Sequence, residues 1–104
     1  MKSRIYKNTY KEWVAKTVIM LTDKLQLTIR TSKHSRGVLV TRATCATVSD
    51  DGSCTTYVMG QDYNEVIDRH YVNRVTEKVI EECHFKTDFA MVIASAKEHY
   101  SLTE

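Results

Sequence analysis

The cysteines and histidines are the residues of this chain whose chemistry could bind a metal ion or attack a substrate. The three cysteines are Cys45, Cys54 and Cys83, and four histidines accompany them. A zinc site uses cysteines in close pairs, with two to four residues between them, and no such pair is present. Cys83 and His84 are neighbours, and neighbours on a helix point in different directions. Because an odd number of widely spaced cysteines does not form a disulfide framework, we expect three free thiols, no metal site and no cofactor.

Paired carboxylates and histidines are the usual acids and bases of enzymes. Asp50 and Asp51 precede Gly52, in a pattern typical of a hairpin turn. His70 falls in an expected helix, partly against the core, where a histidine is more often structural than catalytic. The chain has three glycines and contains neither a Gly-x-Ser-x-Gly elbow nor a glycine-rich phosphate loop. We therefore expect no catalytic residue and no enzymatic activity.

The charge of the chain is divided between its two halves. Residues 1–42 contain ten Lys or Arg and two acidic residues, a net charge of +8, whereas residues 43–104 contain five and eleven, a net charge of −6. This asymmetry is typical of a basic surface that binds nucleic acid or an acidic protein. The alternative is that the two halves lie against each other and their charges intermix on a solvated surface.

Part of the basic half falls in one polar loop. Residues 32–37 separate two expected strands and are polar throughout, so their basic side chains should protrude together. Lys2, Arg4, Lys7 and Lys11 of the N-terminal segment would form one positive region with them. An acidic pole around Glu77, Glu81 and Glu82 should lie opposite it. The candidate binding residues are Lys33, His34 and Arg36 of the loop, together with Arg30, Lys7 and Lys11.

The N-terminal segment, residues 3–22, fits two kinds of element. Thr9 and Glu12 have the spacing of a capping box, and Trp13 begins a stripe that repeats every four positions; both patterns favour a helix. Residues 17–22 are rich in β-branched side chains, which favours a strand instead. We expect a helix that carries the aromatic and basic residues of this segment, and the strand is the alternative.

Alternating apolar and polar residues predict a small antiparallel sheet after this helix. Leu25, Leu27 and Ile29 alternate with polar residues and should face the core. Strands joined in sequence by short turns form a meander. The expected strands are residues 25–30, 38–48 and 55–59, with a hairpin turn at residues 49–53.

Two helices should follow the sheet. A stripe that repeats every four residues predicts one long helix over residues 63–83, and a last helix begins at Thr87 or Asp88 and ends near residue 100. The expected fold class is α+β, with an N-terminal helix, a three-stranded antiparallel meander and two C-terminal helices packed on one sheet face. Residues 1–104 should form a single globular domain. The other sheet face is either solvated or a contact surface.

The expected order of elements, α-β-β-β-α, resembles that of the double-stranded-RNA-binding domain. In that family the loop between the first two strands enters the minor groove, and the loop with Lys33, His34 and Arg36 would do so here. The resemblance is confined to topology. The chain departs from the family at Asp62 and Glu65, where the family has lysines that hold phosphates.

The lack of catalytic motifs favours a binding function over an enzymatic one. We expect a small non-enzymatic interaction module of the inhibitor or adaptor type, as phages and mobile elements encode, that binds a protein or nucleoprotein partner. The alternative is a nucleic-acid-binding protein that uses the basic residues 1–42. No apolar run is long enough for a membrane span or a signal peptide, so we expect a cytoplasmic protein without membrane contact. A homodimer is compatible with the sequence.

Overall fold

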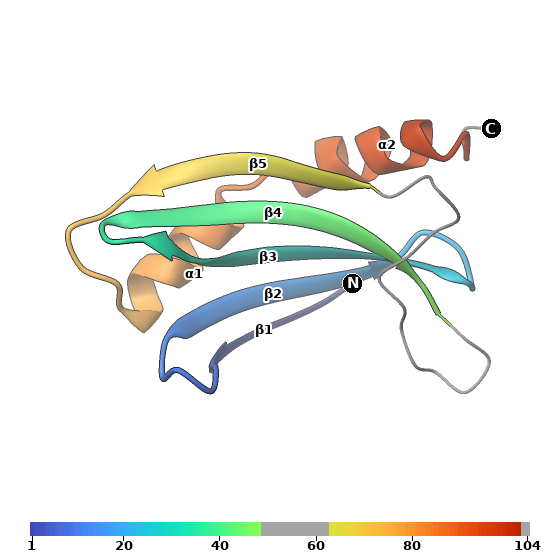
Figure 1. Cartoon of the computed structure of the whole chain (residues 1–104). Coiled ribbons are helices and arrows are strands. Elements are labelled where there is room, and N and C mark those ends of the chain that lie inside the picture. Colours follow the sequence, from blue (N-terminus) through green and yellow to red (C-terminus); the bar gives the residue numbers. More distant parts are fainter. Residues whose placement is uncertain (49–62, 103–104) are drawn as a thin grey trace.

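The structure, a computed structural model, describes residues 1–48 and 63–102. In these residues five strands form one antiparallel sheet, and the strands follow one another across it in the order of the sequence (Figure 1). Two helices come after the last strand. The elements are β1 (Lys2–Lys7), β2 (Trp13–Met20), β3 (Leu25–Ser35), β4 (Val38–Thr47), β5 (Asn64–Tyr71), α1 (Glu77–Phe85) and α2 (Phe89–His99).

The predicted N-terminal helix is wrong, because residues 2–20 form β1, a turn and β2. The β-branched run of β2 decided the outcome: these side chains lose freedom in a helix, and here the strand pairs with β1 on one side and β3 on the other. The apparent capping box lies in the turn. There the side-chain carbonyl of Asn8 accepts hydrogen bonds from the backbone N–H groups of Tyr10 and Glu12, at 2.9 and 3.0 Å.

The predicted helix over residues 63–83 is wrong in its first half, which forms β5. A four-residue repeat is a multiple of the two-residue period of a strand, so the stripe that predicted a helix fits a strand equally well. Only α1 is helical in this segment, and it begins after Thr76, whose hydroxyl accepts a hydrogen bond from the backbone N–H of Val79. The last helix, α2, is confirmed, with Asp88 as its N-cap.

The predicted three-stranded meander is also wrong, because the sheet has five antiparallel strands. The strands expected from residues 25 and 38 onward are present as β3 and β4. The turn expected at residues 49–53 and the strand expected at 55–59 lie outside the described residues. The resemblance to the double-stranded-RNA-binding domain falls with these corrections, because no helix precedes the sheet.

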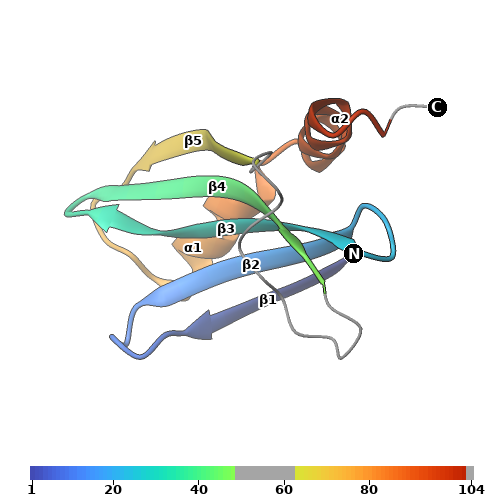
Figure 2. The same ribbon diagram turned by 45° about the vertical axis from the view of Figure 1, so that its right-hand side comes forward.

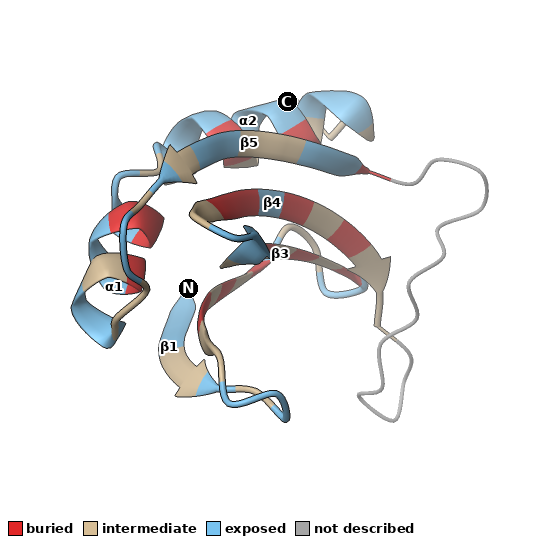
Figure 3. Cartoon of the chain, turned by 60° about the vertical axis from the view of Figure 1, so that its left-hand side comes forward, coloured by how far each residue is buried: buried red, intermediate tan, exposed pale blue. Residues whose placement is uncertain are grey.

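Both helices pack on the same face of the sheet, as Figure 1 and Figure 2 show. Along β4, residues 41–45 alternate between buried and less buried (Figure 3), as expected for a strand with one covered face. Leu27 and Ile29 are fully buried and Leu25 is 8 % exposed, so their predicted core facing is confirmed. Cys45 and Cys83 are buried free thiols, while Cys54 lies outside the described residues.

The core consists of two apolar clusters under the two helices. One joins the centre of β3 and β4 to Val92 and Ala96 of α2. The other joins Ala15 of β2 and Leu39 of β4 to Ile80 of α1. Neither helix is long and apolar enough to cross a membrane, within the part of the chain that the structure describes.

Candidate functional site

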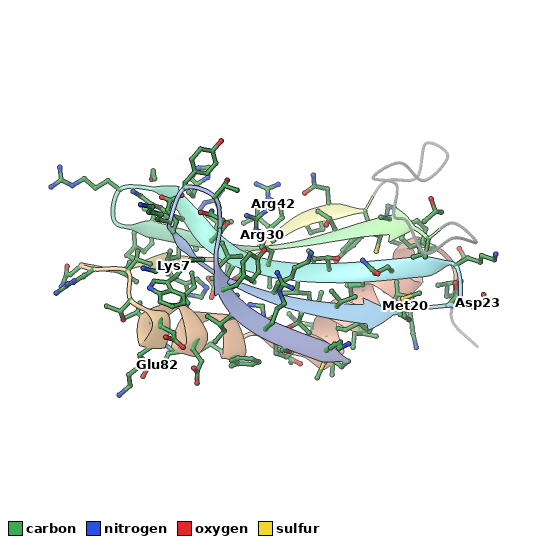
Figure 4. The ribbon with its side chains drawn as sticks, turned by 90° about the horizontal axis from the view of Figure 1, so that it is seen from below. Lys7, Met20, Asp23, Arg30, Arg42 and Glu82 are labelled. Carbon is green, nitrogen blue, oxygen red and sulfur yellow. The ribbon has the colours of Figure 1, made fainter. Side chains whose placement is uncertain are left out.

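The sheet has a second face that no helix covers in residues 1–48 and 63–102, here called the open face. Alternation along each strand decides which side chains reach it. On β2, for example, Ala15 and Thr17 are buried on the covered face, and Lys16 between them lies on the open face. Figure 4 shows Arg30 and Arg42 on the side of the sheet opposite α1, where Glu82 lies.

Four cations of the open face stand directly opposite one another on adjacent strands and are here called the cation row. The antiparallel register pairs Arg4 with Lys16, Lys16 with Arg30, and Arg30 with Arg42. Neighbouring strands are about 4.8 Å apart, so the row crosses four strands over about 14 Å. The three arginines of the row are exposed and Lys16 is half-buried.

None of the five strands carries a carboxylate on the open face within the described residues. Glu65 and Asp68 of β5 oppose Ala43 and Thr41, whose side chains are buried on the covered face. Two more cations, Lys2 and Arg69, oppose open-face valines at the two edges of the sheet. None of these six cations forms an ion pair within the described part of the chain.

Like charges directly opposite one another in a sheet are destabilising. Among the residues that the structure describes, the row makes two contacts with neutral side chains. Arg42 donates a hydrogen bond to the side-chain carbonyl of Asn64 at 2.9 Å, and the guanidinium of Arg4 lies 4.2 Å from the ring centre of Tyr6. Neither contact neutralises charge. No described group of the protein therefore neutralises the positive charge of the row, and an anion from outside the protein would do so.

A hollow of about 510 Å³ adjoins the cation row on the open face. Three row residues line it, Lys16, Arg30 and Arg42, together with the small side chains of Thr28, Ser32, Thr44 and Ala46. The remaining lining consists of the buried Val40 and the larger side chains of Tyr6, Gln26, Lys33 and His34. Its lining mixes polar groups with cations, which suits an anionic ligand.

A chain of hydroxyl groups runs across the covered face directly behind the cation row. Each of its members is the chain neighbour of a row residue, so the two lines share the same backbone. The hydroxyl chain consists of Ser3, Thr17, Thr31 and Thr41. Ser3 contacts Thr17 at 2.8 Å, and Thr31 contacts Thr41 at 2.7 Å, each pair of oxygens on adjacent strands.

His84 of α1 joins the two halves of the hydroxyl chain. Its Nε2 lies 2.7 Å from the Thr17 hydroxyl and its Nδ1 lies 2.9 Å from the Thr31 hydroxyl. At the far end of the chain, the Thr41 hydroxyl lies 2.9 Å from Nε2 of His70. These hydrogen bonds tie β1 to β5 behind the row and hold the strand register that places the cations side by side.

The carboxylate of Asp68 lies 3.8 Å from Nδ1 of His70, at the far end of the hydroxyl chain. A neutral imidazole has one donor and one acceptor nitrogen, so a neutral His84 can donate to one of its two threonine hydroxyls and accept from the other. Burial lowers the pKa of His84 to about 4, in agreement with a neutral imidazole.

The structure divides five of the six predicted binding residues between two places. Arg30 belongs to the cation row and His34 lines the hollow beside it. Three others surround a second hollow of about 320 Å³, at the end of the sheet beside Trp13. These are Lys11, Lys33 and Arg36, of which Lys33 also lines the first hollow.

Two of the predicted residues are occupied by contacts with other side chains. The ammonium of Lys33 lies 3.5 Å from the carboxylate of Glu12. The ammonium of Lys7 lies 5.0 Å from the ring centre of Trp13. Lys33, His34 and Arg36 are all exposed, and their binding role together with Lys7 and Lys11 stays a prediction.

Sequence reasoning assigned no binding role to Lys16 and Arg42, and it included Arg4 in the positive region but placed it on a helix. The signal that could have found them is a Lys or Arg at a polar position of each alternating segment. That signal becomes visible only when the N-terminal segment is interpreted as two strands, because only then do these residues point the same way.

Comparison of the chain with protein-family models, with curated proteins and with solved structures finds no match.

Proposed function

We propose that this protein is a non-enzymatic nucleic-acid-binding protein whose open face contacts the phosphate backbone. The observation that carries the proposal is the cation row, Arg4, Lys16, Arg30 and Arg42, on a face whose strands carry no described carboxylate. Phosphates that replace the counterions of such a row release them to solution, which favours binding. All four residues belong to the basic segment 1–42.

The regular spacing of the row favours nucleic acid over an acidic protein. The row presents one cation per strand, and a nucleic acid presents one phosphate per nucleotide, so both series of charges are periodic. A protein partner, as expected for an interaction module of the inhibitor or adaptor type, presents carboxylates at irregular positions. An acidic protein is therefore the alternative partner, and the binding test below distinguishes it from nucleic acid.

The distribution of charge on the whole molecule supports the same face. Glu77, Glu81 and Glu82 are exposed on α1, on the other side of the sheet from the row. Such a dipolar molecule turns its positive face toward a polyanion during approach, which raises the association rate.

The test is a binding titration of a fluorescein-labelled, mixed-sequence 12-nucleotide DNA, single-stranded and duplex, followed by anisotropy from 50 to 200 mM salt. The row variant replaces Arg4, Lys16, Arg30 and Arg42 with Gln. The matched control makes the same change of charge in the helices and in the segments next to α1. It replaces Arg74, Lys78, Lys86 and Lys97 with Gln.

We expect the wild-type protein to bind at least one form of the DNA, with a strong dependence on salt, and the row variant to lose at least about thirtyfold in affinity. The control variant should lose less than about threefold, because its cations lie outside the row. Equal losses in the two variants would show that net charge alone drives binding. Absence of binding at 50 mM salt, combined with row-dependent binding of polyglutamate, would replace nucleic acid with an acidic protein.

A further inference from the structure

We infer that the nucleic acid on the open face is a single strand that crosses β1 to β4, its phosphates along the cation row and its bases in the adjoining hollow. This inference rests on the proposed function and names the form of nucleic acid that the site accepts. The geometry of the hollow, the twist of the sheet and the shape of the open face each bear on it.

The hollow is shaped for separate bases. Its volume of about 510 Å³ adjoins the cation row and is lined there by Thr28, Thr44, Ala46 and the half-buried ring of Tyr6. Small side chains leave room for a flat ring to lie against the sheet, and hydroxyls provide hydrogen bonds to base edges of any identity. In a duplex the bases are stacked and paired inside the helix, so they could not enter this space.

The twist of the sheet also favours a flexible strand. Neighbouring strands of a sheet are rotated by about 20–25°, so side chains at the two ends of the row point in directions about 60–75° apart. A single strand can turn about its backbone bonds to follow this change. A duplex is stiff over about 150 base pairs, and a straight duplex that rests on the face would reach only part of the row.

The open face lacks a feature that could read a duplex groove. Proteins read grooves with a helix or a ribbon that enters them. Here both helices lie on the covered side of the sheet (Figure 4), and the described part of the open face consists of strands. A strand surface with cations and an aromatic ring is the kind of platform that binds single strands with little sequence preference.

The first experiment compares oligo-dT of 2, 4, 8 and 12 nucleotides with a 12-base-pair duplex, by anisotropy at 50 to 200 mM salt. We expect the 12-nucleotide single strand to bind at least about tenfold more tightly than the duplex. Affinity should rise steeply up to about four nucleotides and slowly beyond, because the row is then filled. The logarithm of the binding constant should fall against the logarithm of salt with a slope of about −3, as for four phosphates of a single strand.

Two variants separate the phosphate contacts from the base contacts. Arg30→Gln should weaken single-strand binding and reduce the salt slope by about 0.7, because one phosphate contact is lost. The double variant Thr28→Ile and Thr44→Ile fills the hollow without changing charge. It should weaken binding about tenfold and leave the slope unchanged, since base contacts release no counterions. Thr9→Ile, in the β1–β2 turn, is the matched control and should change neither quantity.

The outcomes distinguish the inference from the proposed function. Tight single-strand binding that the hollow-filling variant weakens at constant slope would support both. Row-dependent binding in which the duplex equals or exceeds the single strand would overturn the inference and leave the proposed function standing. Failure of both nucleic acids to bind would overturn both proposals. Circular dichroism of each variant at the assay pH verifies that the fold is retained.

Discussion

The imidazole of His84 lies between α1 and the sheet, fully buried, with each ring nitrogen within hydrogen-bond distance of a threonine hydroxyl. Burial disfavours the charged imidazolium and lowers the pKa of His84 to about 4. In the unfolded chain an exposed histidine titrates near its ordinary value of about 6.5. Between these two values the unfolded chain binds more protons than the folded protein.

It follows that the free energy of unfolding should decrease as the pH falls from about 6.5 to about 4, and change little from this source outside that window. The contribution of His84 over the window should be about 3 kcal/mol. Urea denaturation at pH 7 and pH 4.5, on wild type and on His84→Gln, measures it. Gln keeps a donor and an acceptor but does not titrate, so the variant should lose less stability on acidification. Equal losses in the two proteins would contradict a neutral, buried His84.

The hydroxyl of Thr17 contacts both Ser3 and His84, so its removal leaves Nε2 of the buried imidazole without its hydrogen-bond partner. Thr17→Val keeps the shape of the side chain and should cost about 1–3 kcal/mol in stability. The matched control is Thr44→Val on the open face, whose hydroxyl is half-buried, and it should cost less than about 0.5 kcal/mol. Chemical denaturation compares the two, and a Thr17 effect no larger than the Thr44 effect would remove the hydroxyl chain as a structural link.

At the scale of elements, β3 is the centre of the molecule. It pairs with β2 and β4, its apolar side chains fill the core, and its polar side chains reach the cation row. The same strand therefore stabilises the fold with one face and supplies charge with the other. The buried hydroxyl of Thr31 and the exposed guanidinium of Arg30 belong to neighbouring residues, so the stabilising face and the charged face of β3 share one backbone.

Leu27 is fully buried at the middle of β3, in the cluster that β3 and β4 form with α2. Leu27→Ala should cost about 2–5 kcal/mol, because it removes buried methyl groups and leaves a cavity. A loss of this size is a large fraction of the stability of a small domain. Guanidinium denaturation provides the measurement, and a change below about half a kcal/mol would mean that β3 does not face the core here.

At the scale of the whole molecule, charge is separated across the sheet. The cation row occupies the open face, and the acidic residues of α1 lie beyond the covered face. Because α1 and the sheet are firmly packed around a shared core, this dipole is a fixed property of the folded molecule. A polyanion should therefore approach the open face from many starting orientations, at a rate that salt reduces.

Charge reversal at two arginines tests which surface receives the polyanion. Arg30→Glu places a carboxylate within the cation row, whereas Arg36→Glu places one beside the second hollow, near Gly37. We expect Arg30→Glu to lower the affinity for oligo-dT more than tenfold and Arg36→Glu to act mainly on the association rate, by less than about threefold. Stopped-flow fluorescence at several salt concentrations separates the two effects. A larger effect of Arg36→Glu would move the binding surface to the loop of residues 32–37.

The sequence alone was sufficient for features that depend on neighbours along the chain. Strict alternation predicted that Leu25, Leu27 and Ile29 face the core, and a local N-cap at Asp88 predicted the last helix; the structure confirms both. The sequence by itself also shows that most of the Lys and Arg residues lie before residue 43. Each of these follows from short-range geometry, either the two-residue period of a strand or the unpaired N–H groups of a first helical turn.

Tertiary structure decided the rest, because the deciding interactions join distant parts of the chain. A stripe repeating every four residues suits both helix and strand, so the state of residues 3–22 and 63–71 depended on which neighbours were available for pairing. The cation row depended on register as well. Successive members of the row are 12 or 14 residues apart in the sequence, and they stand side by side only because the buried faces of five strands must align over one core. A slip of one residue in any pairing would turn that strand's apolar side chains to water and its cations inward, and this large penalty selects the register that forms the row.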